Sequence, residues 1–523
     1  MNQQTLSGAL EAAFRRWPDR PALTFEGRSL TFAEFESEVA ALAGALRRLG
    51  VGRGDRVVCQ LPNRPELLTT AAATWARAAV YVGADHELTG PELCVYLRLT
   101  GAKALVYAPV ASSPDPFLPL RVVRERHPDV QVIVVGAEAP AGALAFSGLT
   151  RGPARDAHSP ADGPAPEDPA VIFTTSGTTG RPKMPVIYHG RLQRSWVRLA
   201  AELSFGPEDA HLVQLPLAHG LGMMLALAGL VAGGRLVLVE RFSAAAALAL
   251  VGRERVTVLN GSPAHFRLIL DGLTPGRHDV SSLRTGVASG AAFSTTLLRR
   301  IFDELRMSLM LMYGASEGVG VATSDRAEIL RGSVGRPLPD SVAVVGPDRR
   351  PLPAGEVGEI AFSREVFPVR YWGAADDGSP SGETHEVAAG WYYTGDLGRV
   401  DDEGLLYVVG RLKLQINRGG LKVDPSEVEG ALLRCAGVAD AAVLGVPNPV
   451  LGEVVCACVV PSGGGAPSLE NLRAELRREL ARYKLPDELC VLDRIPRTGV
   501  GKVDVQLLRA EVGATPARQR VAG

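Results

Sequence analysis

The residues with the clearest chemical potential form one short segment, Thr174-Thr175-Ser176-Gly177-Thr178-Thr179-Gly180-Arg181-Pro182-Lys183. Hydroxyl groups and glycines crowd a turn directly after an apolar run, and a lysine closes it. Glycines let the backbone approach an anion closely, backbone N–H groups and hydroxyls donate hydrogen bonds to it, and the lysine adds a positive charge. The segment therefore predicts a phosphate-binding loop, against the alternative of a polar surface turn. It is not a Walker A motif, because Arg181 and Pro182 separate Gly180 from Lys183.

Alternating helices and strands are predicted around this loop. Thr31 and Glu34 form a capping box that predicts a helix start, and Gly50 supplies a stop signal for that helix. Apolar, strand-like runs are predicted at 56–60, 104–107, 130–135, 170–173, 235–239 and 256–259. This alternation favours an α/β fold whose stacked layers bury parallel strands on both faces.

The last hundred or so residues show a different pattern, which is typical of a small α+β domain. Asp424, Pro425 and Glu427 together predict a helix start. Strands are predicted at 405–409, 441–446 and 454–460, and a charged amphipathic helix is predicted from about Leu469 to Tyr483. We expect a large N-terminal domain over 1–410 and a small C-terminal domain over 411–523.

Composition excludes several classes of protein. The net charge of −1 provides no global field that would attract nucleic acid or anionic lipid. Hydrophobic residues at 46% and charged residues at 22% exclude a disordered chain. The six cysteines are too scattered for a disulfide framework or a zinc site, which favours a reducing cytoplasm.

One uncharged stretch, residues 212–234, requires a test for membrane insertion. Pro216, His219 and two nearby glycines interrupt it. They leave an apolar core of about a dozen residues, whereas a bilayer span needs about 20. A buried helix is therefore expected, and no membrane span. The first residues show no signal-peptide pattern, in agreement with the expected cytoplasmic location.

Four further motifs follow the loop in order. They are Tyr313-Gly314-Ala315-Ser316-Glu317, Trp391-Tyr392-Tyr393-Thr394-Gly395-Asp396, the hinge-like run from Gly410-Arg411 to Glu429, and Pro496-Arg497-Thr498-Gly499-Val500-Gly501-Lys502. Together the five motifs resemble those of the adenylate-forming superfamily, in its acyl- and aryl-CoA ligase branch. The resemblance runs from about Leu6 to Lys502 and implies a large domain of stacked α/β layers with a small, mobile α+β C-terminal domain.

The resemblance implies an AMP-forming acid–thiol ligase that uses ATP, Mg²⁺ and coenzyme A. In such enzymes a carboxylate attacks the α-phosphate of ATP, which yields an acyl-adenylate and pyrophosphate. Glu317 would bind Mg²⁺, Asp396 with Arg411 would bind the ribose, and Lys502 would bridge the carboxylate and the α-phosphate. The other nucleotide-binding positions would be Thr175, Ser176, Gly177, Thr178, Thr179, Gly180, Lys183, Tyr313, Gly314 and Ser316.

Further roles implied by the resemblance concern the second half-reaction, in which a thiol attacks the adenylate. Lys413 occupies the hinge about which the small domain rotates between the two half-reactions. Gly419 and Gly420 would line the pantetheine channel, where a missing Cβ permits close approach. His219 would stand at the entrance between acid and thiol, although a lone histidine in an apolar run is often a satisfied core residue.

By family position, a pocket for the acid is expected beside His219. Its walls would be Met223, Gly261, Ser262, His265, Ser289, Gly290, Ala291 and Ala292, which are mostly small or apolar and point to a hydrophobic or aryl acid. Peptide-synthetase domains place an aspartate near this histidine segment to pair with an amino group. The sequence has none there, so an amino-acid substrate is not expected.

One departure from the family pattern stands directly after the loop. The family has glycine after the loop lysine, whereas Met184 and Pro185 follow Lys183 here. Proline lacks an N–H donor and restricts the residue before it. Two hypotheses follow: the change is tolerated and the ligase is complete, or adenylation is weak or absent and the protein converts an acyl-adenylate supplied by a partner enzyme.

Other readings remain open at this point. The acyl group could pass to a separate carrier protein, because no carrier domain is recognisable in the chain. A non-catalytic nucleotide- or acyl-binding protein with this fold is opposed by the presence of Lys502 and Glu317. Fold alone does not decide function. Ala-, Gly- and Arg-rich composition suggests a GC-rich bacterial source and a role in natural-product biosynthesis, and the assembly is either a monomer or a homodimer.

Overall fold

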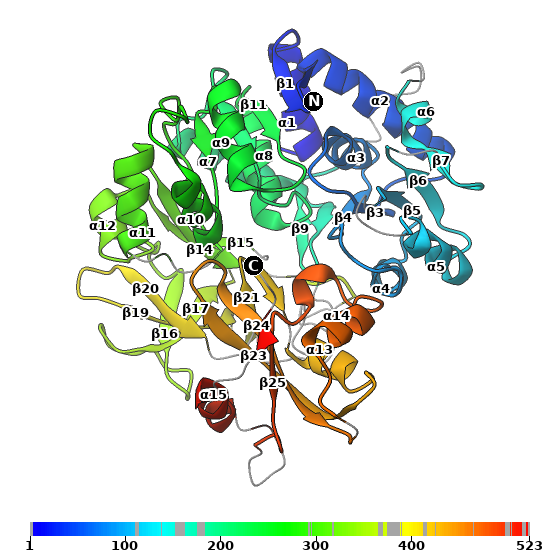
Figure 1. Ribbon diagram of the computed structural model, residues 1–523. Coiled ribbons are helices and arrows are strands. Elements are labelled where there is room, and N and C mark those ends of the chain that lie inside the picture. The colour runs from blue at the N-terminus through cyan, green and yellow to red at the C-terminus, as the bar shows by residue number, and fades with distance from the viewer. Residues whose placement is uncertain are drawn as a thin grey trace.

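The computed structural model describes residues 4–109, 115–136, 139–151, 163–174, 184–290, 293, 295–315, 318–364, 370–373, 387–388, 390–411, 416–423, 425–463, 465–496, 503, 505–514 and 519–520. Figure 1 shows a large N-terminal part, coloured blue to green, and a smaller C-terminal part in orange and red. The predicted fold class is confirmed: a large α/β domain of stacked layers precedes a small α+β domain.

A seven-stranded sheet with the order β7-β6-β5-β3-β4-β8-β9 forms one layer. Every neighbouring pair is parallel except β8 with β9. The strands are β3 (Arg56–Gln60), β4 (Val80–Gly83), β5 (Ala104–Tyr107), β6 (Gln131–Val134), β7 (Leu144–Ala145), β8 (Pro169–Ile172) and β9 (Val186–Tyr188). Four of the six predicted strand runs thus become β3, β5, β6 and β8, which confirms the parallel, buried arrangement.

A second, five-stranded sheet with the order β12-β10-β11-β1-β2 forms another layer. Its strands are β1 (Pro21–Phe25), β2 (Arg28–Thr31), β10 (Ala210–Val213), β11 (Arg235–Leu238) and β12 (Val258–Leu259). The remaining two predicted runs correspond to β11 and β12. The capping box is also confirmed, because the Thr31 hydroxyl accepts from the Glu34 N–H over 3.1 Å and the Glu34 carboxylate accepts from the Thr31 N–H over 2.8 Å.

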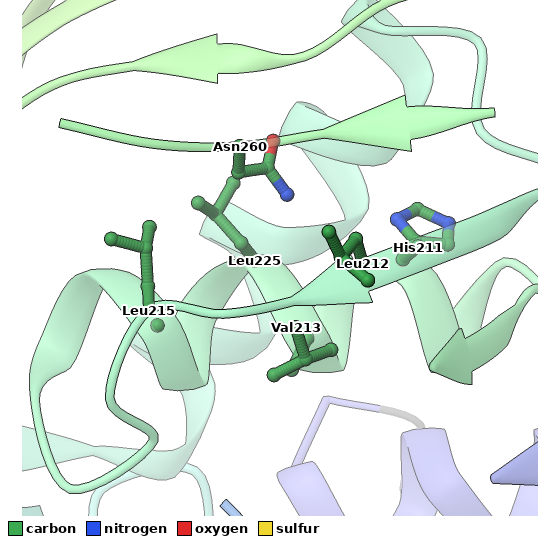
Figure 2. Close-up of a pocket in the computed structure, with 8 residues that line it drawn as sticks. His211, Leu212, Val213, Leu215, Leu225 and Asn260 are labelled. Carbon is green, nitrogen blue, oxygen red and sulfur yellow. The ribbon is translucent and has the colours of Figure 1, made fainter. Parts of the chain in front are cut away.

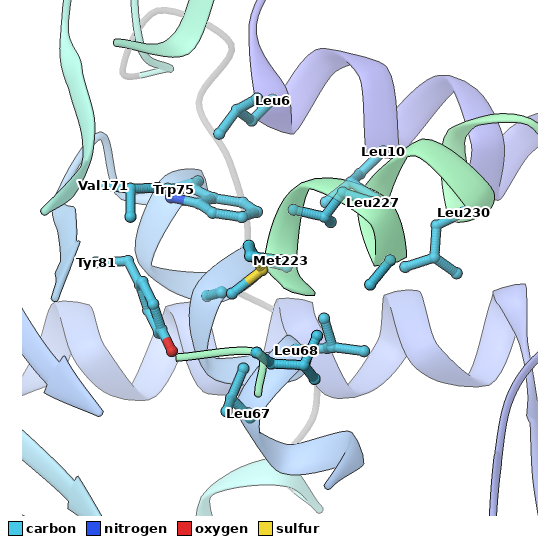
Figure 3. Close-up of a cluster of buried hydrophobic side chains, with 14 of the residues drawn as sticks. Leu6, Leu10, Leu67, Leu68, Trp75, Tyr81, Val171, Met223, Leu227 and Leu230 are labelled. Atoms are coloured by element: carbon cyan, nitrogen blue, oxygen red, sulfur yellow. The ribbon is translucent and has the colours of Figure 1, made fainter. Parts of the chain in front are cut away.

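Helices cover these sheets and share a large apolar core. They are α1 (Leu6–Arg16), α2 (Phe32–Arg48), α3 (Pro65–Ala76), α4 (Gly90–Thr100), α5 (Leu118–Arg126), α6 (Phe146–Thr150), α7 (His189–Glu202), α8 (Gly220–Val231), α9 (Ala244–Arg253), α10 (Pro263–Gly272), α11 (Thr295–Arg300) and α12 (Arg326–Leu330). The uncharged stretch becomes the buried helix α8, which packs beside α1 and Trp75 of α3 (Figure 3). Within the described ranges, no helix has the length and apolar character needed to cross a bilayer.

Two smaller sheets complete the N-terminal domain. One has the order β13-β14-β15, from β13 (Val287–Ala288), β14 (Met310–Ala315) and β15 (Gly318–Thr323). The other has the order β16-β17-β19-β18 with β20 paired to β19. Its strands are β16 (Val342–Val345), β17 (Gly358–Ser363), β18 (Val387–Ala388), β19 (Trp391–Val400) and β20 (Leu406–Arg411).

The C-terminal domain is built around the antiparallel pair of β23 and β24. Its elements are β21 (Ile416–Arg418), β22 (Leu421–Val423), α13 (Pro425–Leu432), β23 (Val438–Asn448), β24 (Gly452–Pro461), α14 (Leu469–Leu476), β25 (Glu488–Val491), α15 (Val505–Ala514) and β26 (Gln519–Arg520). The six cysteines are buried and free, in agreement with the expectation of no disulfide framework.

One predicted helix was too long. The helix expected to reach Tyr483 ends at Leu476, and only a short 3₁₀ turn, Arg482–Lys484, follows. Ala481 is extended, with φ −61° and ψ 150°. This conformation places its N–H 3.4 Å from the Glu92 carboxylate of α4 and Lys484 Nζ 3.0 Å from the same carboxylate. Contacts with the other domain therefore override the local helical pattern.

Candidate active site

Several expected site residues lie at the carboxyl ends of parallel strands. β4 leads into Asp85, β8 leads into Thr174, and β10 leads into the segment that ends at His219. Ligands of open α/β sheets bind at such ends. Two contacts join these segments: the Thr174 hydroxyl donates to the Gly83 carbonyl over 3.1 Å, and Asp85 Oδ2 lies 3.5 Å from His219 Nε2. The start of the predicted phosphate loop and the predicted entrance histidine are thus neighbours of one strand end.

Asp85 is a residue that sequence reasoning missed. Its side chain is only 11% exposed. Burial alone would raise the pKa of Asp85, but contact with His219, the charge of His86 and the backbone N–H of Glu87 lower it to about 2, so the carboxylate is charged at neutral pH. A signal was available, because Asp85 closely follows a buried parallel strand at its ligand-binding end.

The position of Asp85 corrects one sequence argument. The absence of an aspartate beside His219 along the chain was the ground for excluding an acid that carries an amino group. The fold brings the carboxylate of Asp85 to His219 from another strand. An ammonium group near this histidine would therefore have an anionic neighbour, and the exclusion loses its premise.

Two residues predicted to contact the nucleotide lie together on neighbouring sheets. The Tyr313 hydroxyl, at the end of β14, donates to Asp396 Oδ2 of β19 over 2.9 Å. The Thr394 hydroxyl accepts from the Asp396 N–H over 3.0 Å and donates to the Ile360 carbonyl over 2.8 Å. Asp396 pairs in register with Arg411, the last residue of β20. Carboxylate oxygens held in this way suit the hydroxyl groups of a ribose.

Many predicted site residues lie outside the described part of the chain. These are Thr175, Ser176, Gly177, Thr178, Thr179, Gly180, Lys183, Ala291, Ala292, Ser316, Glu317, Lys413 and Lys502. Of Arg411 only the backbone is described, and Gly314 lies within β14. The roles of these residues in binding phosphate, Mg²⁺ and the reacting carboxylate stay predictions.

The predicted acid-pocket residues fall into two places. Gly261, Ser262, Ser289 and Gly290 lie just beyond β12 and β13, and the Ser289 N–H donates to the Gly261 carbonyl over 3.2 Å. Ser262 Oγ lies 2.8 Å from Nδ1 of His265. The ring centroids of His265 and Phe242 are 4.5 Å apart. Burial lowers the pKa of His265 to about 4, so this ring is neutral at pH 7.

Met223 lies elsewhere. Its side chain is fully buried in the core among Trp75, Tyr81 and Leu68, on a face of α8 that turns toward α3 (Figure 3). Residues on another face of the same helix, Gly222 and Leu225, line a cavity instead. The sequence predicted Met223 as a wall of the acid pocket from its position in the family pattern. Its side chain points into the core instead, because that direction depends on how α8 is rotated against its neighbours.

A narrow cavity lies between β10 and α8, next to the predicted acid pocket (Figure 2). Its lining is largely apolar and comprises His211, Leu212, Val213, Leu215, Gly222, Leu225, Ala226 and Asn260. Asn260 directly precedes the predicted wall residues Gly261 and Ser262. Neither ring nitrogen of His211 has a hydrogen-bond partner within the described ranges, and burial lowers the pKa of this histidine to about 4.

A loop of the C-terminal domain reaches the same pocket wall. A Cβ placed at Gly420 would lie 3.8 Å from Ser262 Cβ. Asn417 holds this loop, because its Nδ2 donates to the Gly290 carbonyl over 3.2 Å and its Oδ1 accepts from the Gly420 N–H over 3.1 Å. The neighbouring Gly419 has φ +61° and donates its N–H to the Leu451 carbonyl. The described domain arrangement therefore brings Gly420, one of the two predicted pantetheine-channel glycines, to the wall of the predicted acid pocket.

A buried ion cluster joins the two domains near this site. Lys484 Nζ of the C-terminal domain lies 3.0 Å from the Glu92 carboxylate of α4 and 2.8 Å from the Glu427 carboxylate of α13. The side chain of Lys484 is 7% exposed and that of Glu92 is 12% exposed. Because Glu92 belongs to the large domain and Glu427 to the small one, the cluster stabilises this domain arrangement.

The unusual Met184-Pro185 pair directly precedes the edge strand β9. The Met184 carbonyl accepts from the Trp372 N–H over 2.8 Å, and the Pro185 carbonyl accepts from the Phe173 N–H over 3.2 Å. The bridge that pairs Pro185 with Tyr371 consists of the hydrogen bonds of the flanking residues, in which the Val186 N–H donates to the Arg370 carbonyl over 2.8 Å. It therefore needs no donor on proline. Met184 is 4% exposed and belongs to an apolar cluster that includes Ala481 of the C-terminal domain.

Comparison with known proteins supplies the family. The family model of the AMP-binding enzyme matches residues 10–372, and that of the AMP-binding enzyme C-terminal domain matches residues 427–502. The chain belongs to the AMP-binding, adenylate-forming enzyme family. It is an adenylate-forming ligase, and membership of this family implies ATP-dependent adenylation of a carboxylic acid.

Relatives of known activity match nearly the full chain. Feruloyl-CoA synthase of an Amycolatopsis species is 35% identical over 499 residues, which cover 94% of this chain and 95% of that protein. The 2-hydroxy-7-methoxy-5-methyl-1-naphthoate–CoA ligase of Streptomyces carzinostaticus is 32% identical over 98% of this chain and 93% of that protein. The amide bond synthetase McbA of Marinactinospora thermotolerans superimposes with a TM-score of 0.85 at 29% identity, over 97% of this chain and 99% of the other.

Proposed function

We propose that this ligase activates a hydrophobic or aryl carboxylic acid as its acyl-adenylate and transfers the acyl group to coenzyme A. The contact between the Gly420 loop and Ser262 carries the proposal. It brings the loop expected to line the pantetheine channel to the wall of the expected acid pocket, where Asn417 of the same loop also donates to the Gly290 carbonyl. The thiol and the acyl group would then meet in one place.

The lining of the site supports an acid with an apolar body. The cavity between β10 and α8 is bounded by leucine, valine and alanine side chains, and burial keeps His211 and His265 neutral. A neutral, apolar lining favours a ring or hydrocarbon chain over a charged substituent. The relatives named for ferulate and for a substituted naphthoate also act on aryl acids.

The first half-reaction depends on residues of which only part is described. Tyr313 and Asp396 supply a held carboxylate for the ribose. Met184 and Pro185 directly precede β9, and the hydrogen bonds that join this segment to residues 370–372 need no donor on proline, which supports the hypothesis that the change is tolerated. Lys502 and Glu317 are present in the sequence for the carboxylate and for Mg²⁺. We therefore favour a complete ligase over an enzyme that only consumes pre-formed adenylates.

The deciding experiment separates the two half-reactions. The purified chain is mixed with Mg-ATP, coenzyme A and a panel of hydrophobic and aryl acids, and in parallel with the synthetic acyl-adenylates and coenzyme A. Thioester from acid and ATP is the expected result. Thioester from the adenylates alone would show that adenylation is lost, and Met184→Gly with Pro185→Ala should then restore pyrophosphate release. Lys502→Ala serves as the control that lowers pyrophosphate release.

A second acceptor is favoured by one comparison. The chain superimposes over nearly its full length on an amide bond synthetase. A neutral amine could attack the same acyl-adenylate, and Asp85 would stabilise the positive charge that develops on its nitrogen as the nitrogen–carbon bond forms. The panel therefore includes primary amines and a phosphopantetheinylated carrier protein as acceptors. Amide formed faster than thioester would replace coenzyme A as the proposed acceptor.

The cavity makes the acid preference testable. Leu225 is 2% exposed and lines the cavity from α8, so Leu225→Ala would lengthen the space for the acid. We expect the kcat/KM ratio between an aryl acid with an added alkyl substituent and its parent acid to rise roughly tenfold. Adenylation rates with the two acids measure this ratio.

Leu227→Ala is the matched control for that substitution. Leu227 lies on the same helix and is 1% exposed, but its side chain packs in the core toward α1 (Figure 3). Both substitutions remove the same atoms from a buried site and lower stability. An equal change of acid preference in both variants would show that the cavity is not part of the acid pocket.

A further inference from the structure

Asp85 belongs to the large domain and lies between His219 and His86. It is close enough to the C-terminal domain for its charge to act on Tyr483. Its Oδ2 faces His219 Nε2 at 3.5 Å, its Oδ1 accepts from the Glu87 N–H over 2.9 Å, and His86 Nδ1 lies 3.8 Å from Oδ1. The backbone N–H of Glu87 thus fixes one carboxylate oxygen, and the other is left for the imidazole of His219.

The backbones of the two segments also approach each other closely. A Cβ placed on Gly83 would lie only 2.4 Å from the Ala218 carbonyl oxygen. Only glycine permits this separation, which sets the distance between the residues that follow, Asp85 and His219. Their pairing is therefore built into the packing of β4 against the segment after β10, and does not depend on flexible surface side chains.

His219 turns one ring nitrogen toward Asp85, and its side chain is partly exposed. Its side chain is 33% exposed, and its buried Nε2 forms no hydrogen bond within the described ranges but lies 3.5 Å from Asp85 Oδ2, within ion-pair distance. No described residue forms a hydrogen bond with Nδ1. A carboxylate at Nε2 favours the tautomer that carries its proton there, which leaves the Nδ1 lone pair available as a proton acceptor.

We infer that Asp85 is a positioning residue for the second half-reaction: it holds His219 so that Nδ1 accepts the proton of the attacking thiol. This inference rests on the proposed function. In the step, the sulfur–carbon bond forms and the bond between the acyl carbon and the phosphate oxygen breaks, so AMP leaves with the electron pair. The thiol proton moves to Nδ1, and the anionic Asp85 stabilises the resulting imidazolium.

Other titratable groups surround the pair. On its own segment Asp85 faces His86, and Tyr96 of α4 and Tyr483 of the C-terminal domain lie close enough for its charge to act on them. Burial raises the pKa of both tyrosines, that of Tyr96 to about 12, with a further contribution from Asp85. They therefore stay neutral at working pH.

The test measures each half-reaction of the full-length protein across about pH 6 to 9, the range in which histidine titrates. Asp85→Asn keeps the size of the side chain and removes its charge. We expect thioester formation from the synthetic acyl-adenylate to fall roughly tenfold, with pyrophosphate release from acid and ATP within about twofold of the unaltered protein. The acid limb of the thioester pH profile should also move to lower pH, because the imidazolium loses its anionic neighbour.

Two further variants separate positioning from a structural role. In a His219→Ala background, Asp85→Asn should have no additional effect on thioester formation, since the two residues act as one unit. His86→Gln changes the other histidine beside Asp85 and should leave thioester formation within about twofold of the unaltered protein. Equal slowing of both half-reactions by Asp85→Asn, or an undiminished effect without His219, would overturn the inference.

The outcomes also distinguish this inference from the proposed function. If the unaltered protein forms neither thioester nor pyrophosphate with the acid panel, the proposed function fails, and the role given to Asp85 fails with it. If the unaltered protein forms thioester and Asp85→Asn forms it equally fast with an unchanged pH profile, only the role of Asp85 is overturned.

Discussion

Lys484→Met is expected to lower the free energy of unfolding by about 3 kcal/mol, because it removes the buried ammonium group between two partly buried carboxylates. Glu92 and Glu427 both approach Lys484 Nζ, at 3.0 and 2.8 Å. Without the ammonium group these two carboxylates repel each other in a site that water reaches poorly. Since they belong to different domains, the variant should also separate the domains, which urea unfolding and small-angle X-ray scattering would detect.

An exposed ion pair between Lys103 and Asp55 provides the control. Lys103 contacts Asp55 at 2.8 Å, but its side chain is 50% exposed, so Lys103→Met should cost less than about 1 kcal/mol. Replacing all three charges of the cluster, with Glu92→Gln and Glu427→Gln added to Lys484→Met, should recover most of the loss. An unfolding free energy for Lys484→Met equal to that of Lys103→Met, with an unchanged scattering profile, would contradict the prediction.

The cluster should hold throughout the range in which the ligase is assayed. Burial alone would lower the pKa of Lys484, but Tyr483, Glu92 and Glu427 raise it above its ordinary value of 10.5. A raised pKa in the folded state means that the stabilisation is fully present below the unfolded value and is lost only as pH rises through the folded value. Any loss of domain contact near neutral pH must therefore have another origin.

Gly420→Val is expected to slow thioester formation roughly a hundredfold while adenylation stays within about threefold of the unaltered protein. Gly420 has φ +94°, a conformation that a β-branched residue adopts only with strain. Its added methyl groups would also project toward Ser262, whose Cβ is 3.8 Å from the Cβ position at Gly420. Single-turnover transfer from the synthetic adenylate and pyrophosphate release measure the two half-reactions separately.

Gly437→Val separates backbone strain from obstruction of the channel. Gly437 lies in the same domain with φ +82°, and a Cβ there would meet no atom within 4 Å. It therefore carries a similar strain away from the pocket. If Gly437→Val slowed thioester formation as much as Gly420→Val does, destabilisation of the C-terminal domain, not the channel, would explain the effect.

Local patterns in the sequence were sufficient for much of the fold. The capping box of Thr31 and Glu34, the parallel strands of the large domain and the buried helix α8 all appear as predicted. These features depend on hydrogen bonds between near neighbours or on continuous apolar runs, which a sequence displays directly. The order of five motifs likewise indicated the family that the comparisons establish.

The tertiary structure alone decided which segments meet. Asp85 and His219 lie far apart in the chain, and their contact exists because β4 packs against the segment after β10. Met223 is a core residue because of the rotation of α8, while Gly222 and Leu225 face the cavity. The helix predicted to reach Tyr483 stops at Leu476, since the chain must place Lys484 on Glu92 of the other domain. Residue types and spacing determine local structure and the available chemistry, whereas packing between distant segments determines which side chains act together.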